Sequence, residues 1–98
     1  MEEAKRDHML LRVLTPGGVA AQTECDSVDL TMADDGTGHG GGSVGIRNHH
    51  ADAVMALQKG PALARKDGKM IFSATLSEGF ASVHNNVVTV IVSKAETK

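Results

Sequence analysis

Imidazole and carboxylate side chains gather in one region of this sequence, where together they could bind a transition metal. The candidate ligands are Asp34, Asp35, His39, His49, His50 and Asp52. Zinc and nickel both accept such a mixture of ligands. The spacing matches no compact metal-binding motif, and adjacent histidines in a loop commonly face solvent. A free-standing metal- or ligand-binding domain that uses the first five of these residues is therefore an interpretation that the sequence leaves open.

The glycine-rich segment between these residues is a second candidate site. Residues 36–41 read Gly-Thr-Gly-His-Gly-Gly and match G-x-G-x-x-G, a pattern that in dinucleotide-binding proteins follows a strand and opens a helix. Here Ser-Val-Gly-Ile follows at 43–46, which is too short and too rich in β-formers for that helix. Asp34 and Asp35 also place negative charge where a phosphate would lie. We therefore expect a loop and no nucleotide site.

Catalysis by the chain itself is not expected. The sequence contains no H-E-x-x-H motif and no Ser-His-Asp order that pairs a nucleophile with a base. The single cysteine, Cys25, lies between Glu24 and Asp26, whose negative charges raise the pKa of a thiol and weaken it as a nucleophile. We predict a protein without catalytic residues and without a cofactor.

Length and charge limit the remaining classes. A chain of 98 residues forms one domain, and a hydrophobic content of 41% is enough for a core. A net charge of −2 and only two aromatic residues argue against nucleic-acid binding, which uses basic faces and stacking rings. No apolar run approaches the ~20 residues of a membrane helix, and the single cysteine suits a reducing compartment. We expect a cytoplasmic domain that does not insert into the membrane.

Short strands separated by turn signals must position the candidate residues. Thr-Pro-Gly-Gly at 15–18 ends a first strand, and residues 28–32 alternate apolar with polar side chains as a half-buried strand does. Asp-Gly at 67–68 and Asn-Asn at 85–86 are signals for tight hairpins. Such signals recur about every eight to twelve residues, a spacing typical of sandwiches and barrels. We predict an all-β fold, a two-layer antiparallel β-sandwich of short strands.

The predicted sandwich spans residues 9–95, between a flexible polar leader at 1–8 and a polar tail at 96–98. We expect its core to contain Leu11, Val13, Val28, Leu30, Ile46, Leu57, Ile71, Phe80, Val88 and Val90. The stretch 51–58 is ambiguous, because its Ala, Met, Leu and Gln residues favour a helix that Asn48 could cap, whereas everything around it favours strands.

Three segments resemble the epsilon subunit of the F-type ATP synthase. LRVLTPGGV at 11–19 is similar to its first strand and the turn that follows. GGSVGIRNHHADAVMALQKG at 41–60 resembles G-E-x-G-I-x-P-G-H-A-P-L-L-T-A-L-K-P-G of that family. LSEGFASVHNNVVTVIVSKA at 76–95 resembles L-S-G-G-F-L-E-V-x-x-N-x-V-T-V-L-A-D-x-A. The resemblance covers about residues 10–95, and its specificity comes from three matches in the right order and spacing.

The resemblance implies a strand at 51–58, because the corresponding family segment is a loop followed by a strand. It also implies a function, that of a non-catalytic rotor subunit that couples the gamma stalk to the ring of membrane c subunits. The machine would be a proton- or sodium-translocating F-type ATP synthase, with this subunit peripheral on the cytoplasmic side of the membrane. In some family members ATP is bound by C-terminal helices outside the matched region, so we expect no ATP binding by the sandwich.

The resemblance also points to residues that would contact the ring or the stalk. These are Val44, Ile46, Arg47, Asn48, His49, His50 and Asp52. The family's Pro-Gly-His-Ala-Pro is replaced at 48–52 by Asn-His-His-Ala-Asp, which loses both prolines and the glycine. The polarity of this loop suits a wet contact with polar loops of the ring, positioned by hydrogen bonds and charge complementarity.

Overall fold

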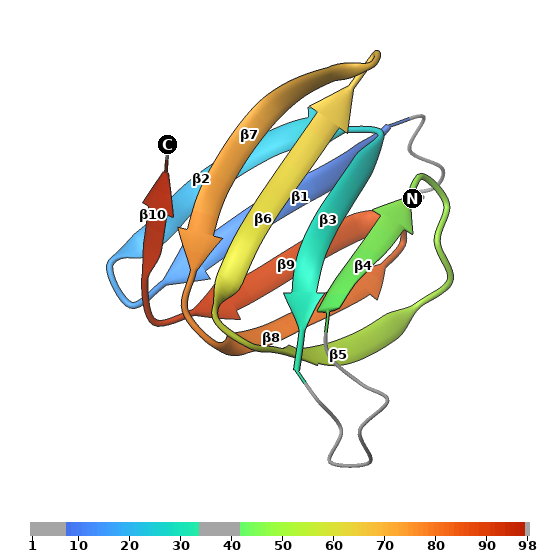
Figure 1. Cartoon of the computed structure of the whole chain (residues 1–98). Coiled ribbons are helices and arrows are strands. Elements are labelled where there is room, and N and C mark those ends of the chain that lie inside the picture. Colours follow the sequence, from blue (N-terminus) through green and yellow to red (C-terminus); the bar gives the residue numbers. More distant parts are fainter. Residues whose placement is uncertain (1–7, 34–41, 98) are drawn as a thin grey trace.

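The computed structural model describes residues 8–33 and 42–97, where every regular element is a β-strand (Figure 1). The strands are β1 Met9–Thr15, β2 Gly18–Cys25, β3 Ser27–Met32, β4 Gly42–Arg47, β5 Ala53–Leu57, β6 Gly60–Lys66, β7 Lys69–Leu76, β8 Gly79–His84, β9 Val87–Val92 and β10 Ala95–Thr97. The predicted polar leader, apart from His8, lies outside the described residues, as do Asp34, Asp35 and His39. Within the described ranges, no helix is long and apolar enough to cross a membrane.

The strands form two layers packed face to face (Figure 1). One layer has the order β10-β7-β6-β3-β4, and the other has the order β5-β8-β9-β1-β2. The chain of hydrogen-bonded strands passes from one layer to the other where β3 meets β5, at the single pair of Met32 with Leu57. The predicted all-β, two-layer sandwich is confirmed.

One pairing departs from the antiparallel pattern. β1 is antiparallel to β2 but parallel to β9, with Leu10 beside Val87 and Leu14 beside Ile91. A parallel pair cannot be joined by a tight turn. No local signal could therefore indicate this contact between two strands that are separated by most of the chain.

Two predicted hairpins have the expected turns. Asp67 and Gly68 join β6 to β7 with φ values of 53° and 78°, and Asn85 and Asn86 join β8 to β9 with φ values of 51° and 64°. Positive φ at both central residues matches the twist of the flanking strands, which explains why Asn, Asp and Gly occupy these positions. Both hairpin predictions are confirmed.

The ambiguous stretch at 51–58 contains strand β5 and no helix. β5 pairs with β8 over its whole length, from Ala53 opposite Val83 to Leu57 opposite Gly79. Leu57 is buried in the core, whereas Val54 is exposed on the outward side. Pairing with a neighbouring strand thus overrides the helical propensity of the segment, and the predicted strand is confirmed.

The core between the layers is built from aliphatic side chains. The predicted members that are buried are Leu11, Val13, Val28, Leu30, Ile46, Leu57, Val88 and Val90. The prediction is wrong for Phe80 and Ile71, which are 60% and 43% exposed. Phe80 lies on the outward side of β8, because Ala81 and Val83 occupy the inward positions of that strand. Ile71 is the extra residue at an irregularity in the pairing of β6 with β7.

Candidate functional site

One buried asparagine holds the loop between β4 and β5 in place. Asn86 is 6% exposed, and its side-chain oxygen accepts a hydrogen bond of 2.7 Å from the backbone N–H of His49. Its side-chain nitrogen donates to Oδ1 of Asn48 at 2.6 Å. Its backbone carbonyl accepts from the N–H of Leu10 at 3.0 Å. The loop at 48–52, the β8–β9 turn and the start of β1 are therefore one connected unit.

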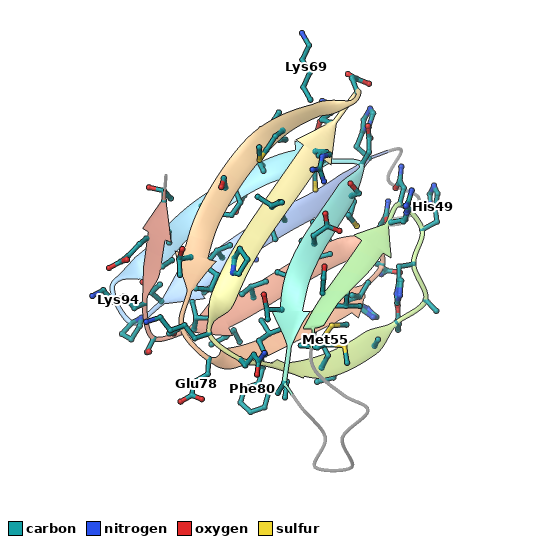
Figure 2. All side chains as sticks on the ribbon, viewed as in Figure 1. His49, Met55, Lys69, Glu78, Phe80 and Lys94 are labelled. Carbon is teal, nitrogen blue, oxygen red and sulfur yellow. The ribbon has the colours of Figure 1, made fainter. Side chains whose placement is uncertain are left out.

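Asp52 and His84 form an exposed pair beside this unit. Nδ1 of His84 lies 2.9 Å from Oδ2 of Asp52, and the N–H of Asn85 donates to Oδ1 of Asp52 at 3.4 Å. The side chain of His84 is 74% exposed and that of Asp52 is 64% exposed, so the pair contributes little to stability. Figure 2 shows His49 at the edge of the molecule, near the tip of β4. The loop thus presents polar side chains to solvent on a fixed backbone.

The residues predicted to contact a partner differ in their exposure. Arg47, His49 and Asp52 are exposed, while Val44, Asn48 and His50 are partly buried. Ile46 is 0% exposed and belongs to the core, so the expectation that it contacts a partner is corrected. It points inward because it lies on the same side of β4 as Val44, which packs against that core. Contact through the other residues stays a prediction.

The described residues do not assemble the alternative metal site. Within residues 8–33 and 42–97, no group of three or more His, Cys, Asp or Glu side chains could hold a metal ion. Nδ1 of His50 lies 2.6 Å from the backbone oxygen of Ala51. Because Asp34, Asp35 and His39 lie outside the described residues, a metal site that includes them stays a prediction.

A second acidic residue, Asp26, connects the β2–β3 junction to the β6–β7 turn through its side chain and to the same loop through its backbone. Its Oδ2 accepts a hydrogen bond of 2.8 Å from the N–H of Asp67, and its Oδ1 lies 3.3 Å from Nδ1 of His8. The hydrogen bond from Asp67 is the main cause that lowers the pKa of Asp26 below 3.8; His8 and Lys66 act in the same direction and desolvation opposes them. The backbone carbonyl of Asp26 accepts from the N–H of Asn48 at 3.0 Å.

Cys25 is unsuited to nucleophilic chemistry. It is 0% exposed, and desolvation raises the pKa of its thiol to about 11, with a smaller contribution from the charge of Asp26 and an opposing one from Lys66. The thiol is therefore protonated at neutral pH and out of reach of a substrate. Its environment agrees with the prediction from the neighbouring acidic residues, although burial is the larger cause.

The outward side of the layer β5-β8-β9-β1-β2, here called the outer face, carries a continuous apolar row. In strand register the row runs through Ala56, Phe80, Ile91, Leu14 and Val19. Phe80, Ile91 and Val19 are 60%, 55% and 56% exposed. Val54 lies next to this row on β5 and is 78% exposed. Figure 2 shows Phe80 pointing away from the ribbon.

The opposite side of the molecule is polar where β3, β4 and β6 meet. Ser27 lies beside both Arg47 and Arg65 in the strand register. Nη1 of Arg65 also donates to Oδ2 of Asp29 at 3.0 Å. Such a surface is typical of a sheet that faces solvent. Of the two outward sides, the outer face is the stronger candidate for a docking surface.

The outer face was not predicted, although its residues belong to strands that were. β8 and β9 carry apolar side chains at both inward and outward positions, so a period of two does not tell which set is inside. Ile91 is exposed while its neighbours Val90 and Val92 are buried. Only the packing of the two layers, which no local pattern contains, decides which set points outward.

Comparison with known proteins relates this chain to one family. Residues 8–98 match the family model of the ATP synthase delta/epsilon chain, beta-sandwich domain. An ATP synthase epsilon chain of Synechococcus sp. (strain JA-2-3B'a(2-13)) is 33% identical over 88 residues, which are 90% of this chain and 58% of that relative. A chloroplastic ATP synthase epsilon chain of Huperzia lucidula is 33% identical over 86 residues, which are 88% of this chain and 56% of that one. This chain thus spans little more than half the length of these relatives.

Two solved structures contain a chain of the same fold. One is the Euglena gracilis mitochondrial ATP synthase, OSCP/F1/c-ring, with a TM-score of 0.78 and 18% identity over 99% of this chain and 57% of that chain. The other is the central stalk/c-ring of the Tetrahymena thermophila mitochondrial ATP synthase, with a TM-score of 0.68 and 19% identity over 94% of this chain and 68% of that chain. At such low identity the likeness establishes the fold alone.

Proposed function

This chain belongs to the ATP synthase delta/epsilon β-sandwich family, and we propose that it is a non-catalytic rotor subunit of a proton- or sodium-translocating F-type ATP synthase. In this role it couples the gamma stalk to the ring of membrane c subunits. It contributes no catalytic residue and binds no cofactor. The proposal is supported by relatives named as epsilon chains and by a structural neighbour from a central stalk and c-ring.

The observation that carries the proposal is the apolar row across the outer face. Single exposed apolar side chains are common on any protein, but a continuous patch with a polar rim marks an interaction site. Phe80 and Ile91 lie beside each other in its middle, both more than half exposed. A sheet face of this kind is a rigid surface for docking against a long shaft. We therefore assign the outer face to the gamma stalk.

The loop at 48–52 is assigned to the polar loops of the c ring. It offers the exposed side chains of His49 and Asp52, with Arg47 at the end of β4, on a backbone that Asn86 fixes. Asn48 and His50 shape the loop, and Val44 borders it. Polar groups on a rigid scaffold position an interface by hydrogen bonds and complementary charge. Through these two contacts the subunit would lie at the cytoplasmic side of the membrane as a peripheral component.

The test is binding of this chain to the gamma subunit of the same organism, measured by calorimetry. Phe80→Ser and Ile91→Ser change the outer face, and Met70→Ser is the matched control, because Met70 is 54% exposed on β7 of the other layer. We expect the wild type and the Met70 variant to bind alike, and each outer-face variant to lose at least about tenfold in affinity.

Thermal melts of the same variants establish that each remains folded. A wild-type chain that does not bind the gamma subunit contradicts the proposed function. If Met70→Ser weakens binding as much as Phe80→Ser does, this result contradicts the assignment of the outer face.

A further inference from the structure

A cationic side chain, Arg12, lies on the outer face beside the apolar row. Arg12 occupies an outward position of β1, beside Thr89 of β9 on one side and Gln22 of β2 on the other. Leu10 and Leu14 hold the outward positions before and after it on the same strand. A partner that covers the apolar row therefore also covers Arg12.

The guanidinium of Arg12 is not neutralised within the described part of the chain. Its Nε atom is closed off from solvent and has no hydrogen-bond partner. Glu24, the nearby acidic residue on β2, lies instead 3.5 Å from Nζ of Lys66. Asp52, on the other border of the face, lies 2.9 Å from Nδ1 of His84. Within the described residues, these two carboxylates therefore have partners other than Arg12.

We propose that the docking partner presents a carboxylate to Arg12. This inference rests on the proposed docking of the outer face onto the gamma stalk, and it adds the chemistry that this contact requires. A guanidinium that is covered by an apolar surface without an acceptor is strongly unfavourable. A carboxylate can accept two parallel hydrogen bonds from the planar guanidinium, and one of them can come from Nε. The gamma surface opposite Arg12 is thus an apolar patch that contains one Asp or Glu.

The pair would set the choice of partner and the register of docking. The apolar row alone is permissive, because apolar contact is not directional. A charge beside the row rejects any surface that lacks a matching acceptor, since the unpaired cation stays desolvated there. Arg12 is accordingly a specificity-determining residue of the interface rather than a residue that stabilises the fold.

The test compares stability of the free chain with affinity for the gamma subunit. In Arg12→Leu the unsatisfied donor is replaced by an apolar side chain, so we expect an equal or higher melting temperature of the free chain. The same variant should bind the gamma subunit about 30-fold more weakly or worse. Arg12→Lys keeps the positive charge but lacks the planar guanidinium, so this variant should lose less affinity than Arg12→Leu. Arg65→Leu, which removes an exposed arginine of the other layer, is the control and should leave this affinity unchanged.

A second measurement identifies the acceptor. Each Asp and Glu of the gamma docking surface is replaced by Asn or Gln, and each variant is combined with Arg12→Leu in a double-mutant cycle. Replacement of one gamma carboxylate should weaken binding as much as Arg12→Leu does. Its effect and that of Arg12→Leu should be non-additive.

The outcomes separate this inference from the function on which it rests. A wild type that does not bind the gamma subunit overturns both. A wild type whose binding is weakened by Phe80→Ser but not by Arg12→Leu overturns the Arg12 inference alone. Purely additive effects for every gamma carboxylate overturn it as well, because the acceptor is then not a carboxylate.

Discussion

The side chain of Asn86 donates to the side chain of Asn48 across 2.6 Å and joins the β8–β9 turn to the loop between β4 and β5. Asn86 is buried, and its side-chain oxygen accepts from the next residue of that loop, His49. A buried polar group that is satisfied in this way rigidifies the segments it connects. The conformation of the loop proposed to meet the ring thus depends on a residue of a different hairpin.

Replacing Asn86 with glycine tests this connection. Glycine accepts the φ of 64° at this position, so the change removes the side chain without straining the backbone. We expect the free energy of unfolding to fall by about 1–3 kcal/mol, because the N–H of His49 loses its acceptor. Urea denaturation measures it. Asn85→Gly is the matched control, since Asn85 has a φ of 51° but an exposed side chain, and equal effects of the two changes would contradict the role of Asn86.

Phe80→Ala should leave the isolated chain nearly as stable as the wild type. The side chain is 60% exposed, so the free energy of unfolding should change by no more than about 0.5 kcal/mol. Leu11→Ala, at a position that is 1% exposed, should cost about 2–5 kcal/mol in the same denaturation experiment. A cost at Phe80 as large as that at Leu11 would place the ring in the core.

Gly79→Ala should be strongly destabilising, because β8 and β9 approach each other closely there. A Cβ atom at Gly79 would lie 2.1 Å from the backbone oxygen of Ile91, so the two strands would have to separate. We expect the free energy of unfolding to fall by at least the usual cost of overpacking, which is about 1–3 kcal/mol. Gly17→Ala is the control, since its nearest heavy atom, Oγ1 of Thr15, would be 3.8 Å away. Similar melting temperatures for the two variants would contradict the close approach.

Asp26 should make stability depend on pH in the acidic range. A carboxyl group whose pKa is lowered by folding stabilises the folded state above its unfolded pKa of 3.8, and this contribution is lost as the pH falls through the lowered value. Asp26→Asn removes the charge but keeps an acceptor for the N–H of Asp67. We expect the wild type to melt at a higher temperature than this variant near neutral pH, and the gap to close in acid. The same comparison in a His8→Gln background removes the contribution of His8. A difference in melting temperature that does not change with pH would contradict the prediction.

Local chemistry was sufficient to predict the hairpins and the fold class. Asn85-Asn86 and Asp67-Gly68 adopt the positive φ values that their side chains tolerate, so the turns could be placed from two residues each. β5 shows where local chemistry fails, because its residues favour a helix and only the pairing of Ala53 with Val83 and its neighbours makes them a strand. The family resemblance supplied that information.

The candidate site was less predictable than the fold. Phe80 and Ala81 are adjacent apolar residues, and which of them faces the core depends on the register with β5 and β9. Arg12 carries no signal in the sequence, and its importance arises from its place beside the apolar row, which residues of other strands such as Ile91 and Val19 complete. The buried role of Asn86 was hidden for the same reason, because its partners belong to a distant loop.

The parallel pairing of β1 with β9 has a consequence for biosynthesis. β1 leaves the ribosome well before β9, the neighbour that completes its place in the sheet, because strands β2 to β8 are made between them. Until Val87–Val92 emerges, one edge of β1 can pair only with other chains, and such open edges are the usual starting points of aggregation. Folding of this domain is therefore governed by contacts that close late, which predicts slow folding and a need for chaperone protection of the nascent chain.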